Sequence, residues 1–511
     1  MRRSACWSLL LLSACSHQGG GCQPCDDNGT FICLQGTIEL DQASTTLHGS
    51  MEHDLFGYAM DAGGDAFRDG RLDIAVGAPL SSIEAWEGAV FVFHGPVGTG
   101  TVQARDADAE IWGAGREDML GSAVAWVGDV TGDRRTDLLV GAACAGGHEE
   151  TETVCWDTGG CEEETTWACG PGKAYLFPGP IAGEVALSEA ILTVTGDADS
   201  AGLGADLGSI GDQDGDGVRE LLMVASGDWR FEGDWARVGV FSGSLRGERA
   251  LDEALAMVTE LGASRIEEPT VARSVSDVNG DGVEDLAIGS RDESRLVVFE
   301  GPLSGTLGQD AATFGVGVSE GGRDGGALGA SLAAGDVNGD GHVDLLAGAP
   351  RAGPWVEGGT GDCWWENGGA YLYLGPLQGQ RTRAEADAVL QGSCEARSFL
   401  TGGAVATGDD LDKDGRDDLL VGDASADASA DGPDTIGKVY LFYGPVSGGI
   451  PVHEADLIMT GTHAYDAAGT SLLMPGDLDG DGFGDLLVGA EQDNQSPVLE
   501  GRVYLVLGGP Q

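Results

Sequence analysis

The chain has 511 residues, of which 84 are acidic and 27 basic, so its formal net charge is −57 at neutral pH. This excess of carboxylates excludes binding to nucleic acid, or to an anionic membrane, through a basic face. Glycine contributes 88 residues, and many of them lie next to aspartate in a recurring pattern.

The chain begins with MRRSACWSLLLLSACS, in which two arginines precede a short apolar stretch. This pattern is typical of an export signal and not of a membrane span. Residues 12–15 (LSAC) look like a bacterial lipobox, which implies a signal peptide over 1–14, cleavage before Cys15 and acylation of its thiol. An ordinary signal peptide is the alternative. We expect residues 15–39 to be a tether, and the protein to be an outer-membrane or cell-surface lipoprotein, or otherwise secreted.

A nine-residue loop pattern then returns seven times along the chain. A clear copy, GDVNGDGHVDLLAGAP, runs from Gly335 to Pro350 and places acidic or amide side chains at alternate positions before an apolar run. Such a segment predicts an oxygen-lined turn followed by a buried strand. An EF-hand is excluded, because it needs a bidentate Glu at loop position twelve, where this chain has Ala347. The loops begin at Asp65, Asp129, Asp212, Asp277, Asp336, Asp410 and Asp477.

Each repeat also contains strands around its loop. A glycine-punctuated strand precedes the loop and the buried strand follows it, then comes an aromatic strand such as GKAYLFPGP (172–180), then a short apolar piece such as AILTVTG (190–196). Four strands per repeat and no helical periodicity predict an all-β, seven-bladed propeller with four-stranded antiparallel blades over 40–511. The last repeat lacks its fourth strand. We expect the N-terminal piece STTLHG (44–49) to close the ring by pairing with blade seven.

This pattern resembles the FG-GAP repeats of the integrin alpha-subunit propeller. The residues that carry the name are Phe56-Gly57 with GAP at 77–79 in the first repeat, and GAP at 348–350 in the fifth. The resemblance covers roughly residues 40–511. In that family the loop between the first and second strands of a blade binds calcium, and the resemblance implies the same for these loops.

The seven loops differ in the oxygen donors that they offer. Five of them have donors at positions one, three, five and nine, with glycine at six, and we expect each to hold calcium. These donors are Asp212, Asp214, Asp216 and Glu220; Asp277, Asn279, Asp281 and Asp285; Asp336, Asn338, Asp340 and Asp344; Asp410, Asp412, Asp414 and Asp418; and Asp477, Asp479, Asp481 and Asp485.

The first two loops are predicted to be weaker sites. Phe67 stands at position three of the first, and Arg134 replaces glycine in the second. Plain turns without metal are the alternative for both. Their candidate ligands are Asp65, Asp69 and Asp73 in the first loop, and Asp129, Thr131, Asp133 and Asp137 in the second. The sequence therefore predicts about five calcium ions, and up to seven.

The cysteines left after export favour disulfides. Four of them crowd the longest connector, and they can form two bridges in three ways. A zinc site is the rival there, but the spacing lacks a C-x-x-C pair. Another two would lie in neighbouring connectors and could pair, and one of the three in the tether should be left over. The three groups are Cys144, Cys155, Cys161 and Cys169; Cys363 and Cys394; and Cys22, Cys25 and Cys33.

Tryptophans gather between the second and third strands of the repeats, in connectors that emerge on the face opposite the calcium loops. Surface aromatic residues can stack on sugars or anchor a protein partner, although they can also plug the connectors as small cores. The candidate ligand-binding residues are Trp86, Trp156, Trp167, Trp229, Trp235, Trp355, Trp364 and Trp365. We interpret the protein as a non-enzymatic, calcium-stabilised module that recognises a glycan or a protein through this face.

The alternative is a hydrolase or lyase that acts on polysaccharide or lipid. The chain has one G-x-S-x-G, around Ser319, but it lies in a turn between repeats and lacks the strand, elbow and helix that expose a nucleophile. His148-Glu149 has no second histidine at the metalloprotease spacing. The sequence therefore favours binding over catalysis.

Overall fold

The structure is a computed structural model. It describes residues 34–51, 54–81, 86–155, 161–197, 202–226, 236–261, 270–317, 326–353, 367–392, 400–426, 435–463, 465–491 and 500–509, with the backbone alone from 149 to 168. The predicted signal peptide, Cys15 and the tether cysteines lie outside these residues.

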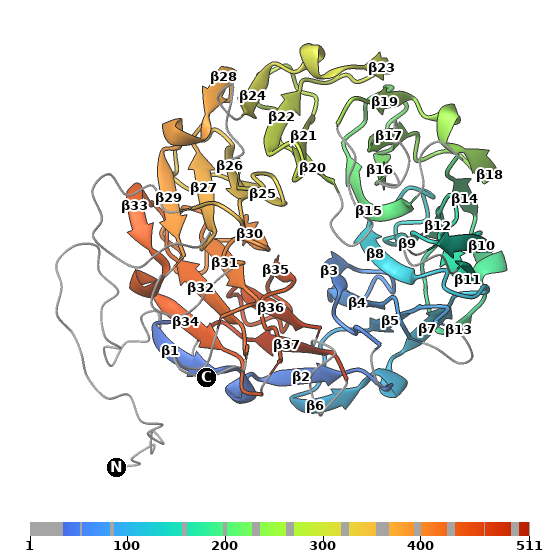
Figure 1. Ribbon diagram of the computed structural model, residues 1–511. Coiled ribbons are helices and arrows are strands. Elements are labelled where there is room, and N and C mark those ends of the chain that lie inside the picture. The colour runs from blue at the N-terminus through green and yellow to red at the C-terminus, as the bar shows by residue number, and fades with distance from the viewer. Residues whose placement is uncertain are drawn as a thin grey trace.

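Seven sheets of the described chain surround a central axis as the blades of a propeller (Figure 1). In each blade four strands pair antiparallel, the first lying innermost. Blades one to four contain β3 (Ala59–Gly64), β4 (Asp73–Ala78), β5 (Ala89–Phe93) and β7 (Ala109–Trp112); β8 (Leu120–Trp126), β9 (Leu138–Ala142), β12 (Lys173–Phe177) and β14 (Leu192–Thr195); β15 (Leu203–Ile210), β16 (Glu220–Ala225), β17 (Arg237–Phe241) and β19 (Ala256–Val258); and β20 (Val271–Val275), β21 (Asp285–Ser290), β22 (Arg295–Phe299) and β24 (Phe314–Gly317).

Blades five to seven repeat this order. They contain β25 (Ser331–Gly335), β26 (Asp344–Gly348), β27 (Gly369–Tyr373) and β29 (Ala388–Gln391); β30 (Val405–Thr407), β31 (Leu419–Asp423), β32 (Lys438–Phe442) and β34 (Leu457–Thr460); and β35 (Leu472–Gly476), β36 (Asp485–Ala490), β37 (Arg502–Val506) and β2 (Thr45–His48). A separate hairpin, β10 (His148–Cys155) with β11 (Cys161–Ala168), extends from blade two.

The predicted four-stranded blade is incomplete, because a fifth strand pairs in parallel with the fourth. It comes from the segment just ahead of the fourth strand of the next blade, so each blade supplies a strand to the one before it. These strands, for blades one to seven, are β13 (Gly183–Val185), β18 (Gly247–Ala250), β23 (Gly305–Leu307), β28 (Gly379–Thr382), β33 (Gly448–Pro451), β1 (Gly36–Glu39) and β6 (Gly100–Gln103). They are short, begin with glycine and are mostly exposed, so they carry no apolar pattern that predicts a strand.

A three-residue 3-10 helix follows each fifth strand. It connects that strand to the fourth strand of the next blade. The helices are η1 (Leu40–Gln42), η2 (Ala104–Asp106), η3 (Leu187–Glu189), η4 (Leu251–Glu253), η5 (Gln309–Ala311), η6 (Arg383–Glu385) and η7 (Val452–Glu454). They are the only helices of the described chain, which makes the fold all-β.

The hydrophobic core is divided into clusters that lie between neighbouring blades. The cluster of Leu139, Leu176, Leu207 and Leu221, for example, joins blade two to blade three, and the described residues form seven such clusters. Second strands such as β4 are buried along their whole length. Each blade thus stabilises its neighbours through apolar burial.

The glycines of the repeat mark where two blades touch through their backbones. A Cβ atom built on Gly77, in the GAP stretch of blade one, would lie 2.1 Å from the carbonyl oxygen of Gly121 at the start of blade two. Gly121 itself has a φ of +89°, which strains any residue with a side chain. The same contact recurs between Gly489 of blade seven and the carbonyl oxygen of Gly57 in blade one.

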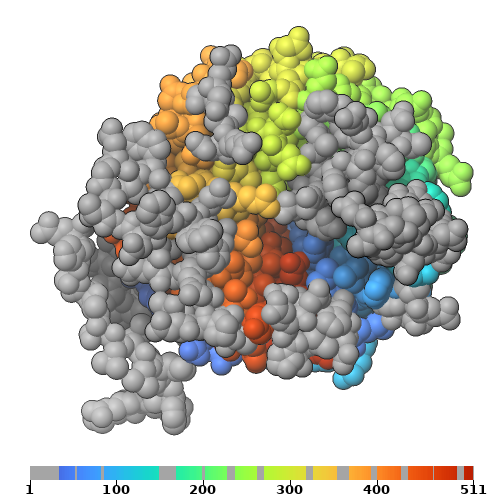
Figure 2. Space-filling model, viewed as in Figure 1, coloured from blue at the N-terminus to red at the C-terminus, as the bar shows by residue number. Residues whose placement is uncertain are grey.

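The N-terminal segment supplies the outer strands of the last two blades. β1 pairs in parallel with β34 of blade six, and β2 pairs antiparallel with β37 of blade seven, Leu47 facing Val503. β1 lies just ahead of the predicted propeller boundary at residue 40. In Figures 1 and 2 the blue N-terminal residues adjoin the red C-terminal ones, so both ends of the propeller meet in one region of the ring.

The innermost strands of all seven blades line a central cavity of about 750 Å³. Asp61 of β3 lies in its wall and accepts hydrogen bonds from the backbone N–H of Trp126, at 2.7 Å, and of Ala62, at 2.9 Å. Burial nevertheless raises the pKa of Asp61 from 3.8 to about 6. The folded protein therefore holds this proton more tightly than the unfolded chain does. That stabilisation is complete below about pH 4 and is lost as the pH rises through 6.

Asp61→Asn is therefore expected to raise the free energy of unfolding at pH 7.5 by less than about 3 kcal/mol. The amide removes the charge, but it keeps an acceptor oxygen for only one of the two backbone N–H groups. The gain should vanish near pH 4, as denaturant melts across this pH range would show. Asp106→Asn, at an exposed position of η2, changes the net charge equally and should give no such pH-dependent gain. An equal effect of both substitutions would assign the gain to net charge alone.

Candidate functional site

The seven predicted loops all connect the first strand of a blade to its second, so the topology places them on one face of the ring. They span 65–73, 129–137, 212–220, 277–285, 336–344, 410–418 and 477–485. Each leaves the innermost strand and enters a fully buried one. We call this side of the molecule the loop face, and the opposite side the connector face.

The first carboxylate of each loop organises the turn. In the third loop Asp212 accepts hydrogen bonds from the backbone N–H of Gly215 at 2.6 Å, Asp216 at 3.1 Å and Gly217 at 2.8 Å. Asp477 accepts the same three bonds in the seventh loop. Gly217 has a φ of +84°, which explains the glycine at position six. The hydrogen bonds to the first carboxylate thus define the shape of the turn by themselves.

The ninth carboxylate ties the loop to the far end of the third strand. Asp285 accepts from the N–H of Val278 at 2.8 Å, within its own loop, and from that of Gly301 at 2.7 Å, just beyond β22. Asp418 makes the matching pair of bonds with Leu411 and Gly444. These carboxylates are buried, and burial raises their pKa values, to about 6 for Asp344 and Asp485 and about 7 for Asp418.

In three of the five stronger loops, carboxylates converge closely enough to hold a metal ion. Their oxygen atoms lie within 4.8 Å of one another in each group: Asp212, Asp214, Asp216 and Glu220 in blade three; Asp410, Asp412 and Asp418 in blade six; and Asp477, Asp479 and Asp485 in blade seven. Carboxylate oxygens in this number suit a hard divalent cation such as calcium.

Glu220 offers an independent test of whether a cation fits. Its Oε2 accepts the N–H of Gln213 at 2.7 Å, but its Oε1 is buried and has no hydrogen-bond partner. Burial, with Asp214 and Asp212 adding repulsion, raises the pKa of Glu220 to about 7. A buried, unpartnered carboxylate oxygen is costly unless something positive meets it. The donor set of the third loop therefore fits a divalent cation.

The fourth and fifth loops have asparagine at position three. Asn338 donates from Nδ2 to Asp340 at 3.0 Å and accepts the backbone N–H of Asp340 at 2.8 Å. Asn279 and Asp281 form the same pair in the fourth loop. The amide N–H group is therefore hydrogen-bonded within the loop. Asparagine also gives these two donor sets one carboxylate fewer.

The first two loops form the same turn with poorer donor sets. In the first, Asp65 accepts the N–H of Asp69 at 2.9 Å and of Gly70 at 3.0 Å, while the Phe67 ring packs 3.6 Å from that of His94. In the second, Arg134 occupies the glycine position at a φ of +71°. Turn geometry is thus retained without a full set of ligands, and metal binding here stays a prediction.

The connector face carries few of the predicted ligand-binding residues within the described chain. Trp86 is 53% exposed, and Trp167 lies on β11, opposite Glu149 in the hairpin register. The other six candidate tryptophans, Ser319, Cys363 and Cys394 lie outside the described residues. Cys144 and Cys169 form a disulfide at the base of the hairpin, and Cys155 is the register partner of Cys161 at its tip.

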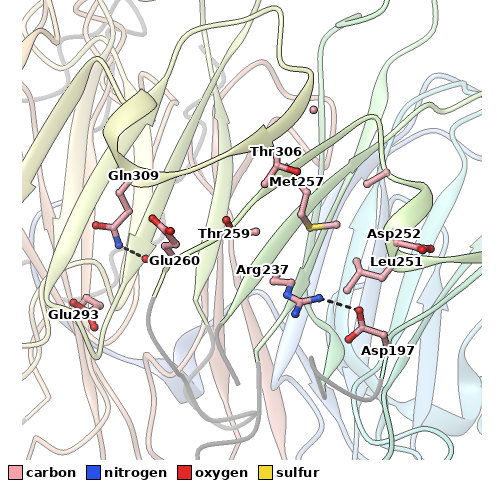
Figure 3. Close-up of a pocket in the computed structure, with 12 residues that line it drawn as sticks. Asp197, Arg237, Leu251, Asp252, Met257, Thr259, Glu260, Glu293, Thr306 and Gln309 are labelled. Carbon is pink, nitrogen blue, oxygen red and sulfur yellow. Dashed lines mark hydrogen bonds and ion pairs between the residues drawn. The ribbon is translucent and has the colours of Figure 1, made fainter. Parts of the chain in front are cut away.

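A cavity on the flank of blade three was not predicted. It measures about 840 Å³ and lies between the outer strands of the blade, with Met257 and Leu251 among its apolar lining (Figure 3). Arg237 pairs with Asp197 at 2.9 Å on one side, while Glu260 lies on the other. These residues come from strand ends far apart in the chain, so only the folded ring brings them together.

Comparison with known proteins identifies the repeats. The FG-GAP repeat family matches residues 328–362 and 468–506. The chain therefore contains FG-GAP repeats in blades five and seven, and it is similar to integrin alpha subunits. It is 34% identical to human integrin alpha-IIb over 186 residues, which cover 35% of this chain and 17% of that protein. It is 31% identical to Drosophila melanogaster integrin alpha-PS2 over 232 residues, or 44% of this chain and 15% of that protein.

The matched stretches of this chain span less than a fifth of the length of these relatives. A solved structure of BBS1N in complex with ARL6DN aligns with 93% of this chain and over 97% of its own length, at 9% identity and a TM-score of 0.44. This TM-score is too low to relate the two proteins. Among the residues that the structure describes, no helix has the length and apolar character needed to cross a membrane.

Proposed function

We propose that this protein is a non-enzymatic, exported binding or adhesion module whose fold is stabilised by calcium. The observation that carries the proposal is the sequence likeness to integrin alpha subunits within a seven-bladed FG-GAP propeller. Export over residues 1–14, lipidation at Cys15 and a tether over 15–39 belong to the same proposal, and would hold the propeller at a membrane surface through a lipid anchor.

Calcium is proposed for the five loops that begin at Asp212, Asp277, Asp336, Asp410 and Asp477. The converging carboxylates of three of them and the unpartnered oxygen of Glu220 support this assignment. When bound, the ion would supply charge neutralisation to the loop. The chain itself fixes the first and ninth ligands through the hydrogen bonds described above, so the site is largely organised in advance.

Ligand recognition is proposed for the connector face, with a glycan or a protein as the ligand. Trp86 supports this assignment, because a large apolar ring that is 53% exposed can stack on a sugar or anchor a protein. The cavity on blade three adds support. Arg237 begins β17 and Glu260 follows β19, so both lie at strand ends on the connector side.

Trp86→Ala is expected to weaken binding at least severalfold on a glycan and matrix-protein array, because it removes an exposed aromatic contact. Trp86→Phe should retain most of the signal, and the melting temperature of both variants should match that of the parent. A hydrolase panel run alongside tests the enzymatic alternative. Turnover that disappears in Ser319→Ala would contradict the proposed function. Array binding that does not change in Trp86→Ala would contradict it as well.

A further inference from the structure

The eighth residue of a loop lies beside the start of the loop in the preceding blade. This residue is not a candidate ligand, and it directly precedes the buried ninth carboxylate. In the second, fourth and sixth loops it is Thr136, Glu284 and Asp417. Each of these polar side chains accepts a hydrogen bond from the neighbouring loop across the blade boundary.

Asp417 makes the most complete of these contacts. Its Oδ2 accepts the backbone N–H of Asp336 at 2.7 Å, and its own N–H donates to the carbonyl oxygen of Asp336 at 3.0 Å. Asp336 is the first ligand of the fifth loop, and Asp418, the next residue after Asp417, is the ninth ligand of the sixth. Two adjacent residues therefore connect two proposed metal sites.

The same arrangement recurs elsewhere in the ring. Thr136 Oγ1 accepts the N–H of Asp65 at 3.1 Å, and the Thr136 N–H donates to the Asp65 carbonyl oxygen at 3.4 Å. Glu284 accepts the N–H of Gly211, the residue before Asp212, at 2.8 Å. Glu284 also pairs with both terminal nitrogens of Arg219, the eighth residue of the third loop, at 2.9 and 3.0 Å.

We propose that Asp417 is a positioning residue that couples the metal sites of the fifth and sixth loops, an inference that rests on the proposed calcium sites. An ion in the sixth loop adds a further bond to Asp418, which hydrogen bonds already orient. It thereby restrains Asp417 in the position from which that residue holds the backbone of Asp336. Thermodynamic linkage requires the converse, so calcium in either loop raises the affinity of the other. Between the fourth and fifth loops the eighth residue is Val343, whose side chain cannot make such a bond.

Hydrogen exchange read by mass spectrometry can follow each loop separately in the full chain. The protection of peptides that cover 336–348 and 410–422 is measured against free calcium, and each peptide gives its own midpoint. Asp412→Ala removes a carboxylate of the sixth-loop cluster and is expected to shift the midpoint of the fifth loop to about fivefold higher calcium or more. The matched control, Asp281→Ala, disables the fourth loop and should leave the midpoint of the fifth unchanged.

Asp417→Ala should itself raise the midpoint of the fifth loop and abolish the further shift caused by Asp412→Ala. Asp417→Asn keeps an acceptor oxygen for the Asp336 N–H and should preserve the coupling, a rescue that a general loss of stability would not show. A shift of equal size in Asp281→Ala, or none in Asp412→Ala, would overturn the coupling and leave calcium binding intact. If neither peptide gains protection with calcium, the calcium assignment fails, and the coupling with it.

Discussion

Chelation of divalent cations is expected to lower the melting temperature of this protein by more than about 10 °C. A ligand at a hundred times its dissociation constant stabilises the folded state by about 2.7 kcal/mol per site, and five sites are proposed. Without the ion, carboxylates such as those of Asp410, Asp412 and Asp418 repel one another within 4.8 Å. Thermal unfolding in the presence of EDTA, followed by titration with calcium, measures the effect.

Screening is the effect that this experiment must separate from binding. The net charge of −57 means that any salt will reduce repulsion to some extent. Sodium chloride at the ionic strength of the calcium buffer is therefore the control, and it should restore only a small part of the melting temperature. Full recovery in sodium chloride would show that the loops are ordinary acidic turns.

Removal of the N-terminal strands is expected to destabilise the ring more than any single substitution on its surface. A chain that starts at residue 50 lacks β1 and β2, so blades six and seven lose their outer strands and expose sheet edges. We expect this variant to unfold at lower denaturant concentration and to self-associate. Light scattering and a denaturant melt at several protein concentrations would reveal both changes.

A point substitution measures the same closure without truncation. Leu47 is fully buried in the cluster between blades seven and one. Leu47→Ala should therefore lower the free energy of unfolding by roughly 2 to 5 kcal/mol. Thr46 lies on the opposite side of the same strand and is only partly buried, so Thr46→Ala should cost much less. Equal losses from the two variants would contradict a closing strand that packs in this register.

Local signals explain why the blade order could be predicted from the sequence. The loop, the buried strand after it and the aromatic third strand each carry a pattern within ten residues or so, and seven copies reinforce one another. STTLHG could be placed because the last repeat visibly lacked a strand. The fifth strands escaped prediction because a segment such as β13, three exposed or half-buried residues, is defined by its partner and not by its own composition.

Contacts across blades set the limit of prediction for the candidate site. The ligands of each loop follow one another in sequence, so their spacing revealed them. The contact between Asp417 and Asp336 joins residues 81 positions apart, and the cavity wall of Arg237, Asp197 and Glu260 is assembled from several strand ends. The four connector cysteines can form two bridges in three ways, and the pair of Cys144 and Cys169 belongs to only one of these. Such pairings depend on blade geometry, which no local pattern encodes.

The position of β2 also bears on how the chain reaches its native state during synthesis. This strand has no antiparallel partner until Arg502–Val506, which follow every other strand of the propeller in the sequence, have been made. Contacts of such sequence separation form slowly, because the loop-closure entropy is lost before they stabilise anything. We therefore expect the growing propeller to be an open arc of docked blades, whose ring closes only once β37 has been made.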